Sequence, residues 1–169
     1  MWAADCAERV LGLFEQEAPD DDRPRDAIAR TRAFGRGELT AAGEIRRRFV
    51  AGRAARDVTS PIAVAAARAA AQASGVAHMG AHALGAAAYS AKAAGLAAPE
   101  EAEAADDEIR WQLEHMSPEV STALARLPAV GTDPAGPLGT GLLAAGALGS
   151  IIRRLQAGIG AATTASDRR

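Results

Sequence analysis

Aromatic residues and cysteine are scarce in this sequence. Phenylalanine, tryptophan and tyrosine make up 4% of its 169 residues, and there is one cysteine. The aromatic residues are Trp2, Phe14, Phe34, Phe49, Tyr89 and Trp111. A core with so few rings has to be built from leucine, isoleucine, valine and alanine, and each alanine buries little apolar area. We therefore expect many small contacts between helices that approach each other closely.

The single cysteine, Cys6, excludes an intrachain disulfide and a zinc site made of several cysteines. It lies on the apolar stripe of an expected helix, and the sequence shows no base beside it. A reactive thiol needs an exposed, electropositive setting. We therefore expect Cys6 to be a small buried hydrophobic residue.

Neither charge dominates, since 19 basic residues stand against 21 acidic ones. A nucleic-acid-binding protein shows a basic excess on one face, so we expect no nucleic-acid partner. The longest apolar stretch, residues 141–152, is shorter than the roughly 18 residues that a membrane span needs, so we expect no membrane segment. Asp5 and Glu8 stand too early for a signal peptide, and the expected location is cytoplasmic.

Alanine is the most abundant residue, at 45 positions, and it is the best helix former. No alternating strand pattern is visible. We predict an all-α fold, a compact helical bundle of about six to eight helices with an extra C-terminal helix. The expected helices span residues 2–17, 23–35, a stretch after Thr40 with Ile45, Phe49 and Ala54 facing inward, 61–78, 81–94, a stretch from Pro99 to about Met116, 117–127 and 141–161.

The composition changes at Pro128, because residues 128–140 hold three glycines and three prolines. We therefore predict two parts, a helical domain over 1–127 and a linker with a C-terminal helix over 128–169. That helix either covers an apolar surface of its own chain or packs on a second copy. Gly141, Ala145 and Gly149 have the spacing of a close helix contact, which would give a homodimer.

Four short segments occur in an order that resembles one known family. They are CAERVL at 6–11, Asp22-Arg23-Pro24-Arg25, HMGAHALGAAAY at 78–89 followed by Lys92-Ala93, and Arg110-Trp111-Gln112. Over about residues 4–127 the chain resembles the immunity proteins of bacterial polymorphic-toxin loci, in their immunity-five-like branch. The resemblance implies a small helical protein that binds a co-encoded toxin and blocks it. It implies no catalytic residue, so the motif positions are binding candidates without an assigned chemistry.

His78 and His82 are candidate metal ligands. If one helix continues through Gly80, two imidazoles four residues apart share a face and can bind one metal ion. Met79 stands where a HExxH zinc site has its glutamate, which excludes the metalloprotease interpretation. The alternative is that both histidines hydrogen-bond buried backbone or carboxylate groups at a helix junction. No cofactor is expected apart from this candidate divalent metal.

The segment around Asp22, Arg23 and Arg25 forms a charged corner. Asp22 is placed to cap the helix that begins at Arg23, and the arginines are suited to bidentate pairing with carboxylates from other helices. A polar binding site is the alternative to capping and local ion pairs. The other basic run, Arg46–Arg48 with Arg53 and Arg56, is expected to be a solvated helix face that could meet an acidic partner.

Tyr89 and Lys92 share one side of a helix with His82, either as a polar pocket or as close packing around Gly85. Trp111 is expected to be a buried or half-buried anchor with His115 one turn further on. Together these features favour a protein that binds a protein partner, such as a toxin. Two alternatives stay open, a metal-binding protein or enzyme using His78 and His82, and a plain oligomerisation domain.

Overall fold

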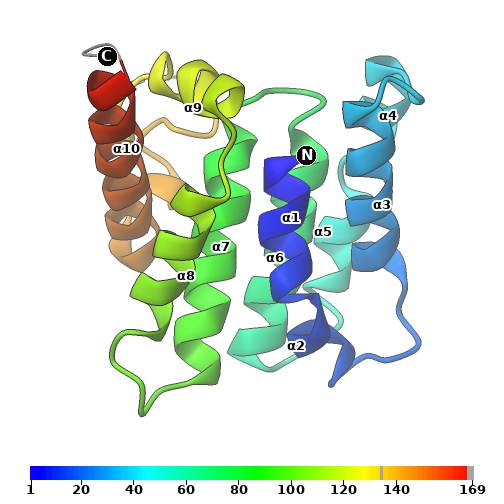
Figure 1. The fold of residues 1–169 in the computed structure, drawn as a ribbon. Coiled ribbons are helices and arrows are strands. Elements are labelled where there is room, and N and C mark those ends of the chain that lie inside the picture. The colour runs from blue at the N-terminus through cyan, green and yellow to red at the C-terminus, as the bar shows by residue number, and fades with distance from the viewer. Residues whose placement is uncertain (134, 167–169) are drawn as a thin grey trace.

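The computed structural model describes residues 1–133 and 135–166, and the side chains of residues 1–133 and 135–161. Every regular element in these ranges is helical, which confirms the predicted all-α fold. Figure 1 shows the helices standing side by side in one bundle. The elements are α1 (Trp2–Arg9), α2 (Leu11–Glu15), α3 (Arg23–Gly35), α4 (Ala41–Arg47), α5 (Val50–Ala54), α6 (Pro61–Gly75), α7 (His82–Ala97), α8 (Ala104–Glu114), α9 (Pro118–Ala125), η1 (Leu142–Ala144) and α10 (Gly146–Ser166).

The centre of the bundle is the pair α6 and α7, which make the most extensive helix–helix contact. Their facing surfaces consist mostly of alanine, with Leu84 fully buried between them and their neighbours. Ser60 caps α6 by accepting a hydrogen bond from the backbone of Ile62 at 3.2 Å, and Pro61 occupies the first turn, as predicted.

The outer helices cover this pair from several sides. The helices α2, α3 and α5 pack on α6, whereas α8 and α10 pack on α7. The first helix, α1, contacts both central helices and buries Trp2, Cys6 and Ala7 against them. Cys6 is fully buried, as expected, and its burial raises the pKa of the thiol, so the thiol stays neutral at physiological pH.

The N-terminal half contains two differences from the expected pattern. The helix expected over 2–17 is broken at Val10, where φ is −110° and ψ is 2°. In the stretch after Thr40, which forms α4 and α5, Phe49 does not face inward, since it is 61% exposed, and Ile45 is only half-buried. Glu44 is the residue that turns inward, because Arg30 of α3 pairs with its carboxylate and compensates its buried charge.

Further along the chain, α8 begins at Ala104, five residues after the expected start at Pro99. Residues 98–103 form turns, although their acidic residues suit a helix N-terminus. The next helix, α9, begins where expected, directly after Ser117. The Ser117 hydroxyl oxygen accepts a hydrogen bond from the backbone N–H of Val120 at 3.4 Å.

The C-terminal helix begins at Gly146, where φ is +52°, and not at Gly141. Gly141 and Ala145 therefore lie outside it. The expected homodimer contact needs Gly141, Ala145 and Gly149 on one helix, and they are not on one helix. The helix packs in cis on α7, α8 and α9 and buries Leu148, Ile151, Ile152, Leu155 and Ile159. The division into 1–127 and 128–169 and the homodimer stay predictions. In the described residues no helix is both long and apolar enough to cross a membrane.

The close approach of α6 and α7 makes Gly85 a sensitive position. A Cβ atom there would collide with the Gln72 side chain and would lie 3.1 Å from Cδ1 of Leu143. We predict that Gly85→Leu lowers the free energy of unfolding by about 1–3 kcal/mol through overpacking. Urea unfolding measures the change. The matched control is Gly12→Leu in α2, where a Cβ meets nothing within 4 Å. Equal stabilities for the two variants would contradict the central position of α7.

Candidate functional site

Buried hydrogen bonds join α1, α7 and α8 where three of the four motif segments meet. The Ser90 hydroxyl donates to the carbonyl oxygen of Cys6 at 2.8 Å. Gln112 Nε2 donates to the carbonyl oxygen of Ala87 at 3.1 Å, and Trp2 Nε1 donates to the carbonyl oxygen of Gln112 at 2.7 Å. The buried motif residues therefore have a structural role, because these hydrogen bonds hold the three helices together.

An ion pair between Arg9 of α1 and Glu108 of α8 is joined to these bonds through Gln112. Arg9 Nε is 2.9 Å from Glu108 Oε2 and 3.1 Å from Oε1, and Gln112 Nε2 donates to the same Oε1 at 3.1 Å. The Glu108 side chain is 5% exposed, whereas that of Arg9 is 39% exposed. The carboxylate is therefore buried but compensated, while the guanidinium reaches the surface.

Trp111 stands between two other side chains of this surface. The guanidinium carbon of Arg9 lies 3.9 Å from the centroid of the indole ring. The ring of His115 stacks on Trp111 at a centroid distance of 4.2 Å, and His115 Nδ1 lies 2.8 Å from the Trp111 carbonyl oxygen. Trp111 is half-buried, so part of the indole is open to a partner while its contacts fix its orientation.

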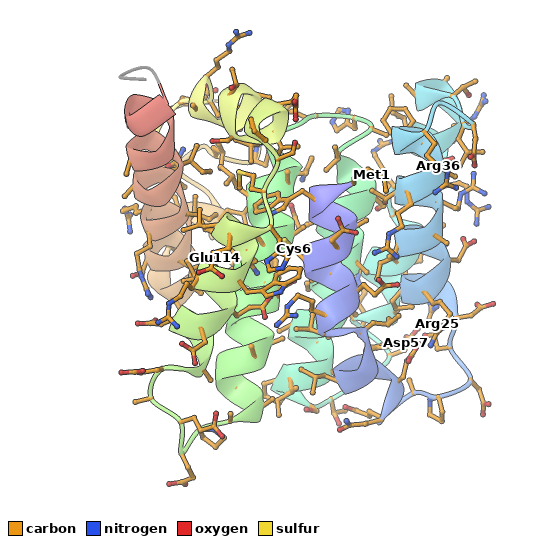
Figure 2. The ribbon with its side chains drawn as sticks, viewed as in Figure 1. Met1, Cys6, Arg25, Arg36, Asp57 and Glu114 are labelled. Carbon is orange, nitrogen blue, oxygen red and sulfur yellow. The ribbon has the colours of Figure 1, made fainter. Side chains whose placement is uncertain are left out.

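These side chains line one side of an open surface cleft with a volume of about 410 Å³. Arg32 of α3 lines the other side and binds Asp5 at 2.7 Å and Glu8 at 2.6 Å. Figure 2 shows the side chains between α1 and α8 near the labelled Cys6. The complete lining is Asp5, Glu8, Arg9, Arg32, Trp111 and His115. We take this surface, the Trp111 cleft, as the candidate site.

The charged corner lies elsewhere, at the start of α3. Asp22 occupies the N-cap position, but its side chain makes no capping hydrogen bond. Asp21 accepts from the backbone N–H of Arg23 at 3.1 Å instead, and Arg23 also pairs with Asp57 at 2.6 Å. Arg25 pairs with Glu15 of α2, as the expectation of pairing between helices requires. Figure 2 labels Arg25 and Asp57 at the lower end of α3.

The two histidines lie at the junction between α6 and α7. The helix does not continue through Gly80, since α6 ends at Gly75 and α7 begins at His82, so the helical spacing on which the metal prediction depends is absent. Their ring centroids are 6.1 Å apart. His82 Nδ1 lies 2.7 Å from Gln72 Oε1, and burial lowers the pKa of His82, as does His78. Only His82 therefore has the hydrogen bond expected at a helix junction, whereas His78 is exposed, and metal binding stays a prediction.

A metal site usually needs a third protein ligand. Among the described residues, no three histidine, cysteine, aspartate or glutamate side chains gather closely enough to hold a metal ion. We therefore assign no mechanism to the histidine pair.

Tyr89 and Lys92 lie on α7, far in sequence from the Trp111 cleft and not among the residues that line it. Tyr89 is 6% exposed, and burial raises the pKa of its hydroxyl. Lys92 is half-buried. The collision of a Cβ at Gly85 with Gln72 shows close packing beside this side of α7, in line with the packing interpretation.

Among the residues that line the cleft, sequence reasoning named Trp111 as a candidate and placed His115 beside it. It missed Asp5 and Arg32 and included Glu8 and Arg9 only as motif positions, because the contacts of these residues join helices distant in the chain. One signal was present, since Glu8-Arg9 and Arg110-Trp111 lie in the first and last motif segments. Taking the exposed motif residues as one surface could have found half of the site.

The fold and the cleft define a small all-helical protein with an open surface site lined by charged and aromatic side chains. The family described as Imm-5 like putative immunity protein matches residues 1–119. The chain therefore belongs to this family, in agreement with the resemblance over about 4–127. Comparisons with curated proteins and with solved structures gave no match.

The Arg9–Glu108 pair yields a first prediction about the site. Arg9→Met leaves the buried Glu108 carboxylate without its guanidinium, so we expect a loss of about 1.5–3 kcal/mol in the free energy of unfolding. Urea unfolding measures this loss. Arg110→Met is the control, because its pair with Asp107 is exposed on both sides and should contribute less than about 1 kcal/mol. A loss no larger than that of the control would show that Glu108 is not held by Arg9.

The pairing between Arg32 and Glu8 yields a pH-dependent prediction. Hydrogen bonds from Arg32 lower the pKa of Glu8. A lowered pKa in the folded state gives stability that is present above the unfolded value of about 4.3 and is lost as the pH falls through the folded value. We expect the Glu8 carboxyl signal in a ¹³C NMR titration to have its midpoint below about 4.3, and Arg32→Met to return it to about 4.3. An unchanged midpoint would contradict the pairing.

Proposed function

We propose that this protein acts in the bacterial cytoplasm as an immunity protein that binds a co-encoded toxin protein and neutralises it. Membership of the family supports an immunity role. The observation that carries the proposal is the Trp111 cleft, which brings a half-exposed tryptophan and two arginines together on one surface. Tryptophan and arginine are the residue types that most often dominate the binding energy of protein interfaces.

The surroundings of the cleft prepare these side chains for binding. Arg9 is held by Glu108 and by the face of Trp111, while Arg32 is held by Asp5 and Glu8. Side chains that are already ordered lose less conformational entropy when a partner binds. A rigid cleft of this kind suits a mechanism of occlusion, in which a helical surface covers the partner's active site.

Co-expression tests this function. Each gene next to the one that encodes this protein is expressed in a bacterial host, alone and together with it. We expect one neighbour to arrest growth alone, growth to be restored in the pair, and the two proteins to purify as a complex. Arrest by a neighbouring gene without rescue or complex formation, or no toxic neighbour at all, would reject the immunity role.

The same complex tests the cleft. We expect Trp111→Ala to weaken the complex by about 2 kcal/mol or more, roughly a thirtyfold rise in Kd, in a titration calorimetry experiment. Trp111→Phe, which keeps an aromatic face for Arg9, should lose less. Leu142→Ala is the control, because Leu142 is 69% exposed and is not among the residues that line the cleft. A complex that tolerates a folded Trp111→Ala variant would place the interface elsewhere.

A further inference from the structure

A second surface lies on α4 and α5 and is separate from the Trp111 cleft. Residues 46–56 contain five arginines and no acidic residue. The two helices meet at Arg48 and Phe49, where φ and ψ are −51° and −21°, and −97° and −5°. The angles at Phe49 lie outside the helical range, so the chain breaks between the two helices. The pattern of burial continues across this break, because the buried residues Glu44, Ala51, Ala54 and Ala55 recur at spacings of seven, three and one residues.

This spacing divides the stretch into two opposite faces. One face is buried by α3 and α6 and carries Glu44, Ala51 and Ala54. The other carries Arg46, Phe49, Arg53 and Arg56, at spacings of three, four and three residues, and all four are exposed. We call these four residues the arginine face.

Phe49 is the apolar centre of the arginine face. It is 61% exposed, although burying a phenylalanine side chain stabilises a protein. The guanidinium carbon of Arg48 lies 4.3 Å from the centroid of its ring and covers part of it. The fold leaves the rest of the ring to solvent, between positive charges.

The arginines of this face also differ from most others in the described chain. Arg9, Arg23, Arg25, Arg30, Arg32, Arg36, Arg47, Arg110 and Arg154 each pair with a carboxylate. Within the same described residues, Arg46, Arg53 and Arg56 form no hydrogen bond and no ion pair through their side chains. Most other arginines of the described residues are therefore paired with a carboxylate, whereas these three are exposed and lie on one face without such a partner.

We propose that the arginine face docks an acidic segment of a partner protein, with an apolar side chain of that segment packed on Phe49. Arginine pairs with carboxylates through two parallel hydrogen bonds, and an aromatic ring beside it adds apolar contact area. Two carboxylates lie beside the arginine face. Asp26 pairs with Arg47, next to Arg46 in the chain, and Asp57 directly follows Arg56 and has a side chain that is 62% exposed. These carboxylates would repel the continuous phosphate backbone of a nucleic acid, whereas a short acidic segment can avoid them.

This inference goes beyond the toxin-binding proposal, because it names a different surface and the charge of what binds there. Defined probes test it on the full chain. A fluorescein-labelled peptide of glutamates with leucines at helical spacing is titrated with the protein and followed by fluorescence anisotropy. The same peptide with glutamine in place of glutamate is the probe control. We expect the glutamate peptide to bind, to bind more weakly as salt is raised, and to bind at least about tenfold more tightly than the glutamine peptide.

Variants then locate the site. We expect Arg46→Glu/Arg53→Glu and Phe49→Ala each to weaken binding of the glutamate peptide by about tenfold or more. The matched control is Arg126→Glu/Arg153→Glu, because Arg126, directly after α9, and Arg153, on α10, are exposed and pair with no carboxylate among the described residues. The control should change the Kd by less than about twofold. Arg46→Gln/Arg53→Gln keeps the test valid if charge reversal unfolds the protein, which far-UV circular dichroism reveals.

Three outcomes would overturn the inference. The glutamate peptide fails to bind, the control variant loses as much affinity as the face variants, or Phe49→Ala leaves the affinity unchanged. Tighter binding of a single-stranded DNA oligonucleotide or of phosphatidylserine vesicles, lost in Arg46→Glu/Arg53→Glu, would also overturn it in favour of another class of partner. The co-expression and calorimetry experiments change no residue of this face, and the peptide experiment needs no toxin, so either proposal can fail while the other holds.

Discussion

The whole bundle depends on how closely α6 and α7 approach each other through alanine and glycine. Their interface buries Ala66, Ala69, Ala73, Ala86 and Ala87 almost completely. Small side chains bring the backbones close together, but each contributes less to the hydrophobic free energy than a leucine does. The central pair therefore provides a well-defined frame at a modest gain in stability, and the outer helices need further interactions to stay on it.

Those further interactions are largely polar and use arginine. Trp2, Ser90 and Gln112 join α1, α7 and α8 through buried hydrogen bonds to backbone carbonyls. Arg9 connects α1 to α8, and Arg32 connects α3 to α1. Such pairs contribute little when they are exposed and more when one partner is buried, as Glu108 is. The Trp111 cleft is therefore the outer end of the same contacts that hold three helices on the central pair.

The sequence predicted the fold class and most helix positions, because alanine content, Ser60-Pro61 and Ser117-Pro118 act locally along the chain. It failed where tertiary contacts decide. Phe49 was expected inside but is 61% exposed, whereas Glu44, for which no expectation was made, is buried and paired with Arg30. The start of the last helix was misplaced because Gly146 adopts a positive φ, which no neighbouring residue indicates. Of the cleft, the sequence placed only Trp111 and the neighbouring His115, since the positions of Arg9 and Arg32 depend on packing between distant segments.

The motif residues fall into two groups that burial separates. Cys6, Ala87 and Gln112 are fully buried, and their contacts account for their presence through the packing of α1, α7 and α8. Glu8, Arg9 and Trp111 reach the surface, where the ion pairs of Glu8 and Arg9 and the contact between Arg9 and Trp111 account for only part of each side chain. Packing therefore explains the first group without a partner, whereas for the second a partner that contacts them supplies the missing reason. On this argument the arginine face is a different case, because it lies outside all four motif segments, so what binds there need not be what the family shares.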